Sequence, residues 1–371
     1  MTQRYELKAL TGARGIAAWF VVLFHLRFMM TGVGGPTGPL SYGYLAVDFF
    51  FVLSGFVIWL TYGERLREGG LASIPEFLKR RVARVWPLHL FMLGCAIPFA
   101  LLLAMTGRPD WGQYPPAELP LHFLLLQNWG FTDRLTWNVP AWSISCELAA
   151  YLVFPFLVMA IDWRKLPTLA LLGAAGVFTT LIWAAFSFTG NATLGHGIMT
   201  IGVPRCLGEF ALGTIMCALW LRWRDAPARP ALAAAATGIA LLAAHIAGLI
   251  PQTVALPLAF SALVLVLALT SGMRGNLLES ASVHFLGEIS YATYLGHWLL
   301  WMGFKLVFVG ESGLSWPLFI LFVAMVLASS AFLYHVVERP AQRWLNAVRL
   351  PSRLREGSGE GVATSKAHRG G

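Results

Sequence analysis

Arg14 and His25 are the residues of this chain whose types and spacing first indicate chemistry. Both lie in the apolar stretch Leu7–Met30, which is long enough to cross a bilayer. On a helix their spacing is three turns plus roughly 20°, so both side chains leave one face about 16 Å apart. Ionisable groups within a span normally face a bundle interior or a watery cavity. The pair therefore indicates a functional face, although contact of Arg14 with headgroups and of His25 with a neighbouring helix would also account for each residue.

His25 has the chemistry of a general base. A neutral imidazole can take the proton of an acceptor hydroxyl as that hydroxyl attacks a thioester carbonyl, provided that burial or a nearby acid tunes its pKa. Asp48, at a comparable depth, and Glu147, about two turns inside the outer surface, are the candidates for orienting the ring. Arg14 or a tyrosine is expected to position the thioester or stabilise its oxyanion.

Four acidic and basic residues also have alternative roles. Asp48 suits the first turn of a helix, where the helix dipole stabilises a carboxylate. Glu147 is able to pair with Arg205, with His25 or with a substrate. Arg205 and Glu209 are spaced i, i+4, which favours a structural ion pair between them.

A basic cluster at Lys79, Arg80, Arg81 and Arg84 precedes the third expected span. In a helix its arginines are about one turn apart, so at least two guanidinium groups can converge on one anion. Arginine suits phosphate because its planar fork binds two oxygens. The cluster predicts a phosphate site for a cytoplasmic nucleotide or coenzyme, and membrane orientation with anionic lipid contact is the equally weighted alternative.

A polar stripe runs along the ninth expected span. Tyr291 and Tyr294 share a helix face one turn apart, and His297 follows about one turn later. In a membrane helix such a stripe argues for a cavity rather than lipid. The outer segment 106–140 is rich in aromatic residues, Asn and Pro, and its apolar part at 121–126 is too short to span. That part is expected to lie along the interface or to re-enter the membrane.

The elements that must position these residues are membrane helices. The 371-residue chain is 57% hydrophobic with a mean hydropathy of +0.66, which is too apolar for a soluble globular protein. Hydrophobic runs of about twenty residues, each matching the hydrocarbon core, recur about ten times. The predicted fold class is an all-α polytopic membrane protein with about ten transmembrane helices.

The net charge of +9 indicates membrane orientation rather than binding to nucleic acid. With a cytoplasmic N-terminus, the outer segments hold only Arg27, Arg108 and Arg134 of the 27 lysines and arginines. This bias predicts that both termini are cytoplasmic and that membrane lipids surround the protein. The four cysteines lie in or beside apolar runs without metal-type spacing, so neither a disulfide framework nor a metal site is expected.

Local signals set the expected helix limits. In the second span, at 44–62, Ser54 and Gly55 are small enough for another helix to approach closely. The third span is expected to open at Trp86 and Pro87. The last is expected to end at Glu338–Pro340, where proline stops the helix and the charges sit in water. Residues 1–345 then form one transmembrane domain, and 346–371 a disordered cytoplasmic tail.

Six motifs, in order along nearly the whole chain, resemble the integral-membrane acyltransferase family 3. That family includes O-antigen and exopolysaccharide O-acetylases and macrolide O-acyltransferases. The most specific motif is Arg14 with ten residues before His25, preceded by Leu10 and followed by Gly15. The others are Phe49–Phe56, Arg80-Arg81 with Arg84 and Pro87, Trp142-Ser143 with Glu147, Ser290-Tyr291 with Tyr294, Leu295 and His297, and Glu338-Arg339-Pro340.

The resemblance implies a multi-pass enzyme of the bacterial inner membrane that transfers an acyl group, most often acetyl, from acyl-CoA to a carbohydrate hydroxyl. Acyl-CoA (acetyl-CoA) is then a co-substrate, with no permanently bound cofactor, and the acceptor is a surface polysaccharide, lipopolysaccharide or glycoside. His25 and Arg14 become the catalytic pair, with Glu147 and Asp48 assisting. Coenzyme contacts are implied for Arg80, Arg81 and Arg84, and substrate contacts for Tyr291, Tyr294, His297, Arg205 and Trp142.

A transporter or flippase of a glycolipid or acylated sugar is the alternative, because buried charges also line transport pathways. Such transporters often show paired, interrupted helices in two related halves. The sequence shows no such repeat, which favours the enzyme.

Overall fold

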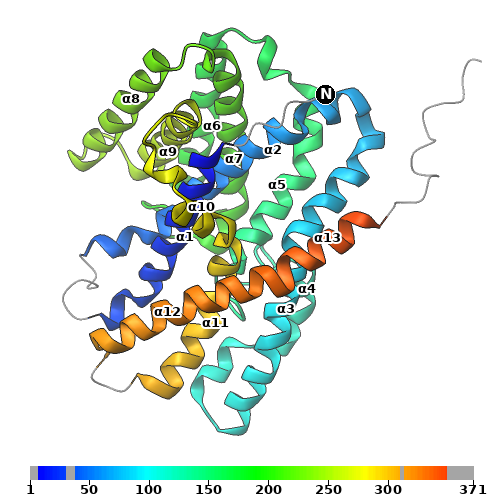
Figure 1. Cartoon of the computed structure of the whole chain (residues 1–371), viewed down its shortest axis with the longest axis vertical. Coiled ribbons are helices and arrows are strands. Elements are labelled where there is room, and N and C mark those ends of the chain that lie inside the picture. Colours follow the sequence, from blue (N-terminus) through cyan, green and yellow to red (C-terminus); the bar gives the residue numbers. More distant parts are fainter. Residues whose placement is uncertain (1–6, 31–37, 310–312, 349–371) are drawn as a thin grey trace, which may run out of the picture.

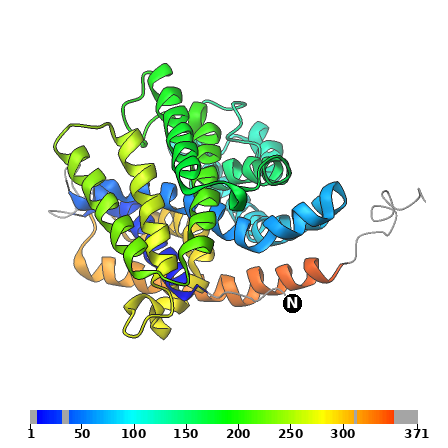
Figure 2. The same ribbon diagram turned by 90° about the horizontal axis from the view of Figure 1, so that it is seen from above.

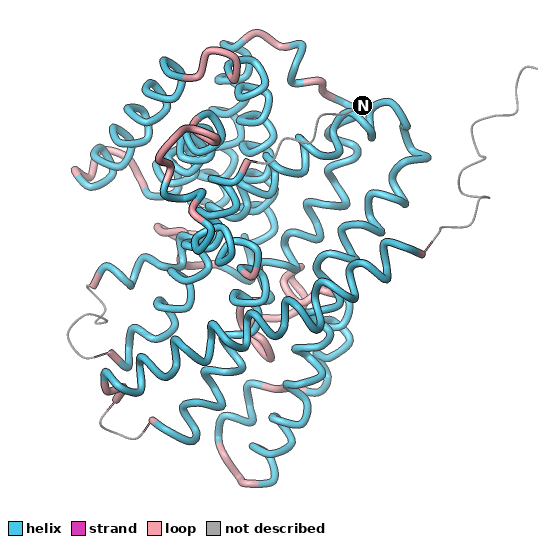
Figure 3. Tube along the Cα trace, viewed as in Figure 1, coloured by secondary structure: helices cyan, strands magenta, loops and turns pink. Residues whose placement is uncertain are grey.

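The computed structural model describes residues 7–30, 38–309 and 313–348. Within these ranges the chain consists of helices joined by loops, without a β-strand (Figures 1 and 3). The α-helices, in chain order, are α1 Lys8–Leu26, α2 Ala46–Gly69, α3 Ile74–Met105, α4 Leu119–Leu124, α5 Ala141–Ala160, α6 Thr168–Phe188, α7 Ile198–Trp223, α8 Ala228–Ile246, α9 Gln252–Leu269, α10 Ala281–Glu288, α11 Ser290–Phe308, α12 Trp316–Phe332 and α13 Arg339–Ala347.

The prediction of an all-α polytopic membrane protein is confirmed. Within the described ranges, eight helical stretches are long and apolar enough to cross a membrane. One of these, Pro39–Met105, contains both α2 and α3. Helix α11, which carries the polar stripe, is not among the eight. The number of spans and the cytoplasmic position of the termini stay predictions.

Helix α7 forms the centre of the bundle. It packs against α2, α5, α6 and α9, and 83% of its most apolar window is buried, against 11% for α8 at the periphery (Figure 2). Helices α2 and α7 approach closely because glycines meet at their crossing. A Cβ on Gly55 would come within 1.9 Å of the Phe210 carbonyl oxygen, and one on Gly213 within 1.9 Å of the Val52 carbonyl oxygen. The packing role predicted for Gly55 is confirmed.

The expected start of the third span is wrong. Helix α3 begins at Ile74 and contains Pro87 and Pro98, so Pro87 lies inside a helix rather than opening one. Membrane helices tolerate internal proline where neighbours satisfy the disturbed backbone groups. Here the Tyr291 hydroxyl donates to the Val85 carbonyl oxygen at 2.6 Å, beside the proline.

The expected end of the last span is also wrong. Helix α12 continues through a π-helical turn, Leu333–Glu338, into α13. Pro340 closely follows this π-helical turn, so the helical segment continues past the position at which the proline was expected to stop it. Glu338 is buried and pairs with Arg84 instead of sitting in water. The expected domain boundary after residue 345 falls within α13, and residues 349–371 of the expected tail lie outside the described residues.

Part of the segment 106–140 packs against α3 through α4, whereas the choice between an interfacial and a re-entrant position for residues 121–126 stays a prediction. In α4, the Phe123 carbonyl accepts from Trp86 Nε1 at 2.7 Å, and His89 Nε2 lies 2.7 Å from the His122 carbonyl oxygen. His89 lies about 24 Å along α3 from Met105, so α4 reaches well below the end of that helix. Burial lowers the pKa of His122 to about 3, which keeps this connecting histidine neutral.

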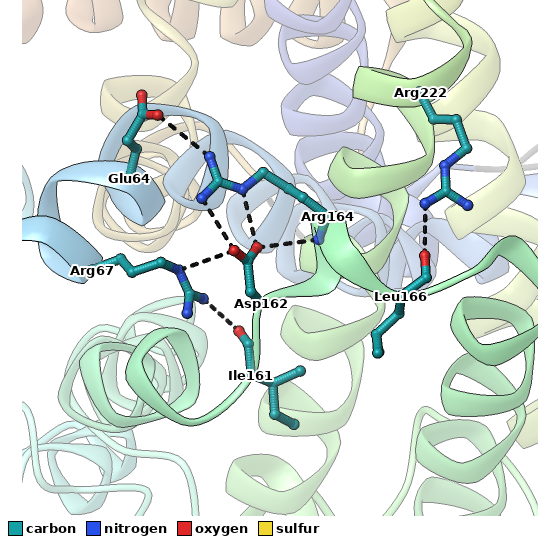
Figure 4. A network of polar contacts seen from close by, with 7 residues as sticks. All are labelled: Glu64, Arg67, Ile161, Asp162, Arg164, Leu166 and Arg222. Atoms are coloured by element: carbon teal, nitrogen blue, oxygen red, sulfur yellow. Dashed lines mark hydrogen bonds and ion pairs between the residues drawn. The ribbon is translucent and has the colours of Figure 1, made fainter.

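Basic residues assigned to one side of the membrane gather at one end of the bundle (Figure 4). Arg164 Nε lies 3.0 Å from Asp162 Oδ1, Arg67 Nη2 donates to the Ile161 carbonyl at 2.6 Å, and Arg222 Nη2 donates to that of Leu166 at 2.6 Å. The hydrogen bonds from Arg164 hold the pKa of Asp162 below its ordinary value. These contacts tie the ends of α2 and α7 to the α5–α6 connection.

Candidate active site

Two of the cavities in the bundle are lined by most of the candidate site residues, whereas Asp48, Arg80 and His297 line neither of them. The arginine cavity, defined by Arg14, Arg81 and Arg84 with Glu147 and Tyr291, encloses about 850 Å³ of empty space including its mouth. The histidine cavity, defined by His25 with Tyr44, Trp142, His196 and Arg205, encloses about 1280 Å³ on the same basis. Arg14 and His25 share a helix face but therefore line different cavities.

Arg14 is held on the arginine cavity by the junction of α10 and α11. Its Nη2 donates to the Gly287 carbonyl oxygen at 2.7 Å and its Nε to the same oxygen at 3.2 Å. Gly15 and Gly287 allow α1 to lie this close, because a Cβ on Gly287 would come within 2.0 Å of the Thr11 carbonyl oxygen. The guanidinium retains three further N–H groups that can donate to a ligand.

The three arginines of the basic cluster separate in the structure. Arg84 pairs with the buried Glu338, and Arg81 Nη2 donates to the Tyr62 hydroxyl at 2.8 Å. Both line the arginine cavity, whereas Arg80 does not. Arg80 Nε instead donates to Glu76 Oε1 at 2.8 Å, in a pair that is about 40% exposed on each side. Arg81 and Arg84 therefore line one cavity together with Arg14, and the convergence of two guanidinium groups on one anion stays a prediction.

Glu147 lines the arginine cavity, where its carboxylate accepts a hydrogen bond from the Ser54 hydroxyl. Of the partners considered from the sequence, neither His25 nor Arg205 is joined to it by a hydrogen bond or ion pair within the described residues. Glu147 therefore faces the same compartment as the arginines and stays a candidate for contacting a substrate there.

A hydrogen-bond chain runs from α11 to His25, which lines the histidine cavity. His297 Nδ1 lies 3.0 Å from the Thr293 carbonyl oxygen, and His297 Nε2 lies 3.0 Å from His25 Nδ1. A carbonyl oxygen only accepts, so His297 Nδ1 carries a hydrogen and its Nε2 must accept from His25 Nδ1–H. With both rings neutral, this placement leaves the lone pair of His25 on Nε2.

Asp48 has a different partner from the one expected. Arg205 Nε donates to Asp48 Oδ1 at 2.6 Å, and Arg205 Nη1 donates to the Leu194 carbonyl at 2.7 Å. Asp48 and Arg205 are 0% and 2% exposed, so this is a buried ion pair. No hydrogen bond between Asp48 and His25 occurs in the described part of the chain. Glu209 Oε1 lies 4.0 Å from Arg205 Nε, so the i, i+4 pair is the longer contact.

The remaining predicted substrate residues lie around these compartments. Trp142 lines the histidine cavity, with the Arg205 guanidinium carbon 5.6 Å from its ring centroid. Tyr291 lines the arginine cavity. Tyr294 lines both cavities, and its hydroxyl lies 2.7 Å from Ser143 Oγ.

Sequence reasoning misses three partnerships at this site, of which the pair of Asp48 with Arg205 is one. The sequence predicts substrate contact for His297, and the structure makes it the partner of His25. The sequence predicts that Glu338 sits in water, and in the structure it pairs with Arg84 on the arginine cavity. The residue types themselves are the signal that could have found these contacts. Each is an ionisable residue in or beside an apolar helix, and such a residue needs a partner.

The fold and the site together define a polytopic membrane protein with a histidine on one cavity and three arginines on another. The family model described as "Acyltransferase domain" matches residues 7–335. The chain therefore belongs to this acyltransferase family, which confirms the resemblance drawn from the motifs.

Individual relatives agree with this family. The chain is 30% identical to "Acyltransferase MdmB" of Streptomyces mycarofaciens over 92% of each chain. It is 25% identical to "O-acetyltransferase OatA" of Staphylococcus aureus over 58% of this chain and 35% of that protein. A third relative, "Protein 2 in picA locus" of Rhizobium radiobacter, is 35% identical over 39% of this chain and 78% of its own. No solved structure matches.

Proposed function

We propose that this protein is an acyl-CoA-dependent O-acyltransferase of a bacterial inner membrane, which transfers a short acyl group, acetyl first among them, to a carbohydrate hydroxyl. The observation that carries the proposal is the division of the bundle into an arginine cavity and a histidine cavity. An enzyme that transfers an acyl group from a phosphate-bearing donor to a hydroxyl has two binding tasks. It must bind the anionic donor and, next to it, activate the acceptor hydroxyl. The acyltransferase family supports this function over transport of a glycolipid.

The arginine cavity suits the donor. Arg14 and Arg81 line it with guanidinium groups that have no carboxylate partner among the hydrogen bonds and ion pairs of the described residues. Arg84 adds a third cation, balanced by Glu338. Phosphate and pyrophosphate groups of a coenzyme fit such a set because arginine binds their oxygens bidentately. We place this cavity on the cytoplasmic side, where the positive-inside bias puts the basic cluster.

The histidine cavity suits the acceptor. Its wall combines aromatic rings of Phe24, Tyr44 and Trp142 with the polar side chains of Thr193 and His196. Aromatic faces beside hydrogen-bonding groups form an amphipathic surface. Such a surface complements a sugar. We infer that a hydroxyl of a polysaccharide, lipopolysaccharide or glycoside binds beside His25.

The reaction follows from the proton placement. His25 Nε2 removes the acceptor proton as the hydroxyl oxygen attacks the thioester carbonyl. The tetrahedral intermediate collapses with cleavage of the C–S bond, and the coenzyme thiolate takes up the proton held by His25. During this step His25 is an imidazolium whose Nδ1–H still donates to His297. Arg14 lies on the other compartment, so its part is to position the donor.

Coenzyme A binding tests the donor assignment. We expect Arg81→Gln to weaken binding of coenzyme A to the purified protein by about tenfold to a hundredfold, because it removes charge-assisted hydrogen bonds to phosphate. Arg80→Gln is the matched control, since Arg80 is the adjacent arginine and does not line the cavity. Equal losses in both variants, or no binding by the wild-type protein, would contradict the assignment. An acyl label that stays on coenzyme A while sugar crosses the membrane would identify a transporter.

His297 is expected to act by positioning His25. His297→Ala removes the acceptor for His25 Nδ1–H, and we expect kcat to fall by about 10²–10⁴-fold because the base is no longer held in its active tautomer. His297→Gln supplies an amide oxygen that can accept the same hydrogen, so part of the activity should return. Coenzyme A affinity should be unchanged in both variants. A His297→Ala protein with wild-type kcat, or one equally impaired in coenzyme binding, would show that His297 does not have this role.

A further inference from the structure

The arginine cavity and the histidine cavity share one lining residue within the described part of the chain, Tyr294. The neighbouring walls belong to one compartment or the other: Ser143 and Phe50 face the arginine cavity, whereas Trp142 and Val47 face the histidine cavity. The side chain of Tyr294 is 6% exposed. It therefore forms the boundary between the two compartments.

Few contacts hold this side chain in place. Its hydroxyl lies 2.7 Å from Ser143 Oγ and donates to the Pro140 carbonyl oxygen at 3.1 Å, both at the start of α5. Its ring meets Phe50 edge-on with centroids 5.7 Å apart. On the opposite side, the His297 ring centroid is 6.4 Å away. The boundary thus adjoins the partner of the proposed base and is anchored by two hydrogen bonds between neutral groups.

We propose that Tyr294 is the partition that keeps the donor thioester apart from water and acceptor in the histidine cavity until both substrates are bound. The inference rests on the proposed function. Passage of the acyl group requires the ring to swing out of the boundary, which breaks the hydrogen bonds to Ser143 and Pro140. Without a partition, water in the histidine cavity would attack the thioester carbonyl. The C–S bond would break, giving a free carboxylic acid and coenzyme A thiol.

Acyl-CoA hydrolysis in the absence of acceptor tests the partition. In the purified full-length protein we expect Tyr294→Ala to raise hydrolysis of acetyl-CoA at least fivefold over wild type and to lower the ratio of transfer to hydrolysis. Tyr294→Phe keeps the ring that fills the boundary but loses both hydrogen bonds, so its hydrolysis should lie between that of wild type and that of Tyr294→Ala. Unchanged hydrolysis in a folded Tyr294→Ala protein would overturn the proposal, as would equal hydrolysis in the two variants.

Thiol labelling gives a readout that does not depend on activity. Leu53 lines only the arginine cavity and is buried. The Leu53→Cys substitution is made in the wild-type and in the Tyr294→Ala background, and a membrane-impermeant thiol reagent is added on the histidine-cavity side. Residue 53 should be labelled in the Tyr294→Ala background and not in the wild-type background, as read at that position by mass spectrometry. Equal labelling in both backgrounds would overturn the partition. A wild-type protein that transfers no acyl group from acyl-CoA would instead overturn the proposed function, whatever the labelling shows.

Discussion

Replacing His25 by alanine is expected to abolish acyl transfer, with kcat at least about 10³-fold below wild type, while coenzyme A binding and the fold stay unchanged. The first part follows because general-base catalysis contributes about 10²–10⁴-fold and His25 is the proposed base. The second follows because His25 lines the histidine cavity and not the arginine cavity. Product formation, coenzyme A binding and thermal stability of the purified protein measure the three quantities.

His245→Ala is the matched control for His25→Ala. His245 is also a histidine in an apolar helix, but it lies in α8, where its Nδ1 is 3.1 Å from the Ile250 carbonyl oxygen and it lines neither cavity. We expect this control to retain full transfer activity. Retention of activity by His25→Ala would remove the base from the mechanism, and so would a parallel loss of coenzyme A binding.

Replacing Asp48 by alanine is expected to destabilise the protein by about 3–5 kcal/mol, because it removes the hydrogen-bonded partner of the buried Arg205 and leaves that charge only the 4.0 Å contact with Glu209. The double variant Asp48→Ala with Arg205→Met removes both charges of the closer pair and should recover part of the lost stability, since Glu209 then stays buried without a cation. Asp225→Ala is a control at an exposed pair, since Asp225 is 92% exposed beside Arg224, and it should change stability by less than about 1 kcal/mol.

Thermal unfolding in one detergent, with transfer activity measured below the transition, separates the two roles considered for Asp48. A stabilising role requires the melting temperature to fall in Asp48→Ala and to recover in the double variant. If Asp48→Ala keeps the wild-type melting temperature and loses activity, then Asp48 acts in catalysis, as the sequence had suggested, and the pairing with Arg205 is not its main function.

Much of the architecture could be predicted from the sequence because the signals are local. A run of apolar residues long enough for the bilayer predicts a helix wherever it occurs, and the spacing of Arg14 and His25 places them on one face of that helix. The small residue Gly55 indicated a close helix contact, which α7 supplies. The rule that a proline begins or ends a helix failed at Pro87 and Pro340. Both residues lie within continuous helical segments, because surrounding helices can support an internal proline.

The sequence alone established an all-α membrane protein, its acyltransferase family and the residues able to do chemistry. Only the tertiary structure decided their partners and their division between two cavities. His25 meets His297 across 272 positions, Arg84 meets Glu338 across 254, and Asp48 meets Arg205 across 157. The physical reason is that helix periodicity defines which residues share a face, whereas the rotation and depth of one helix against another depend on the packing of the whole bundle.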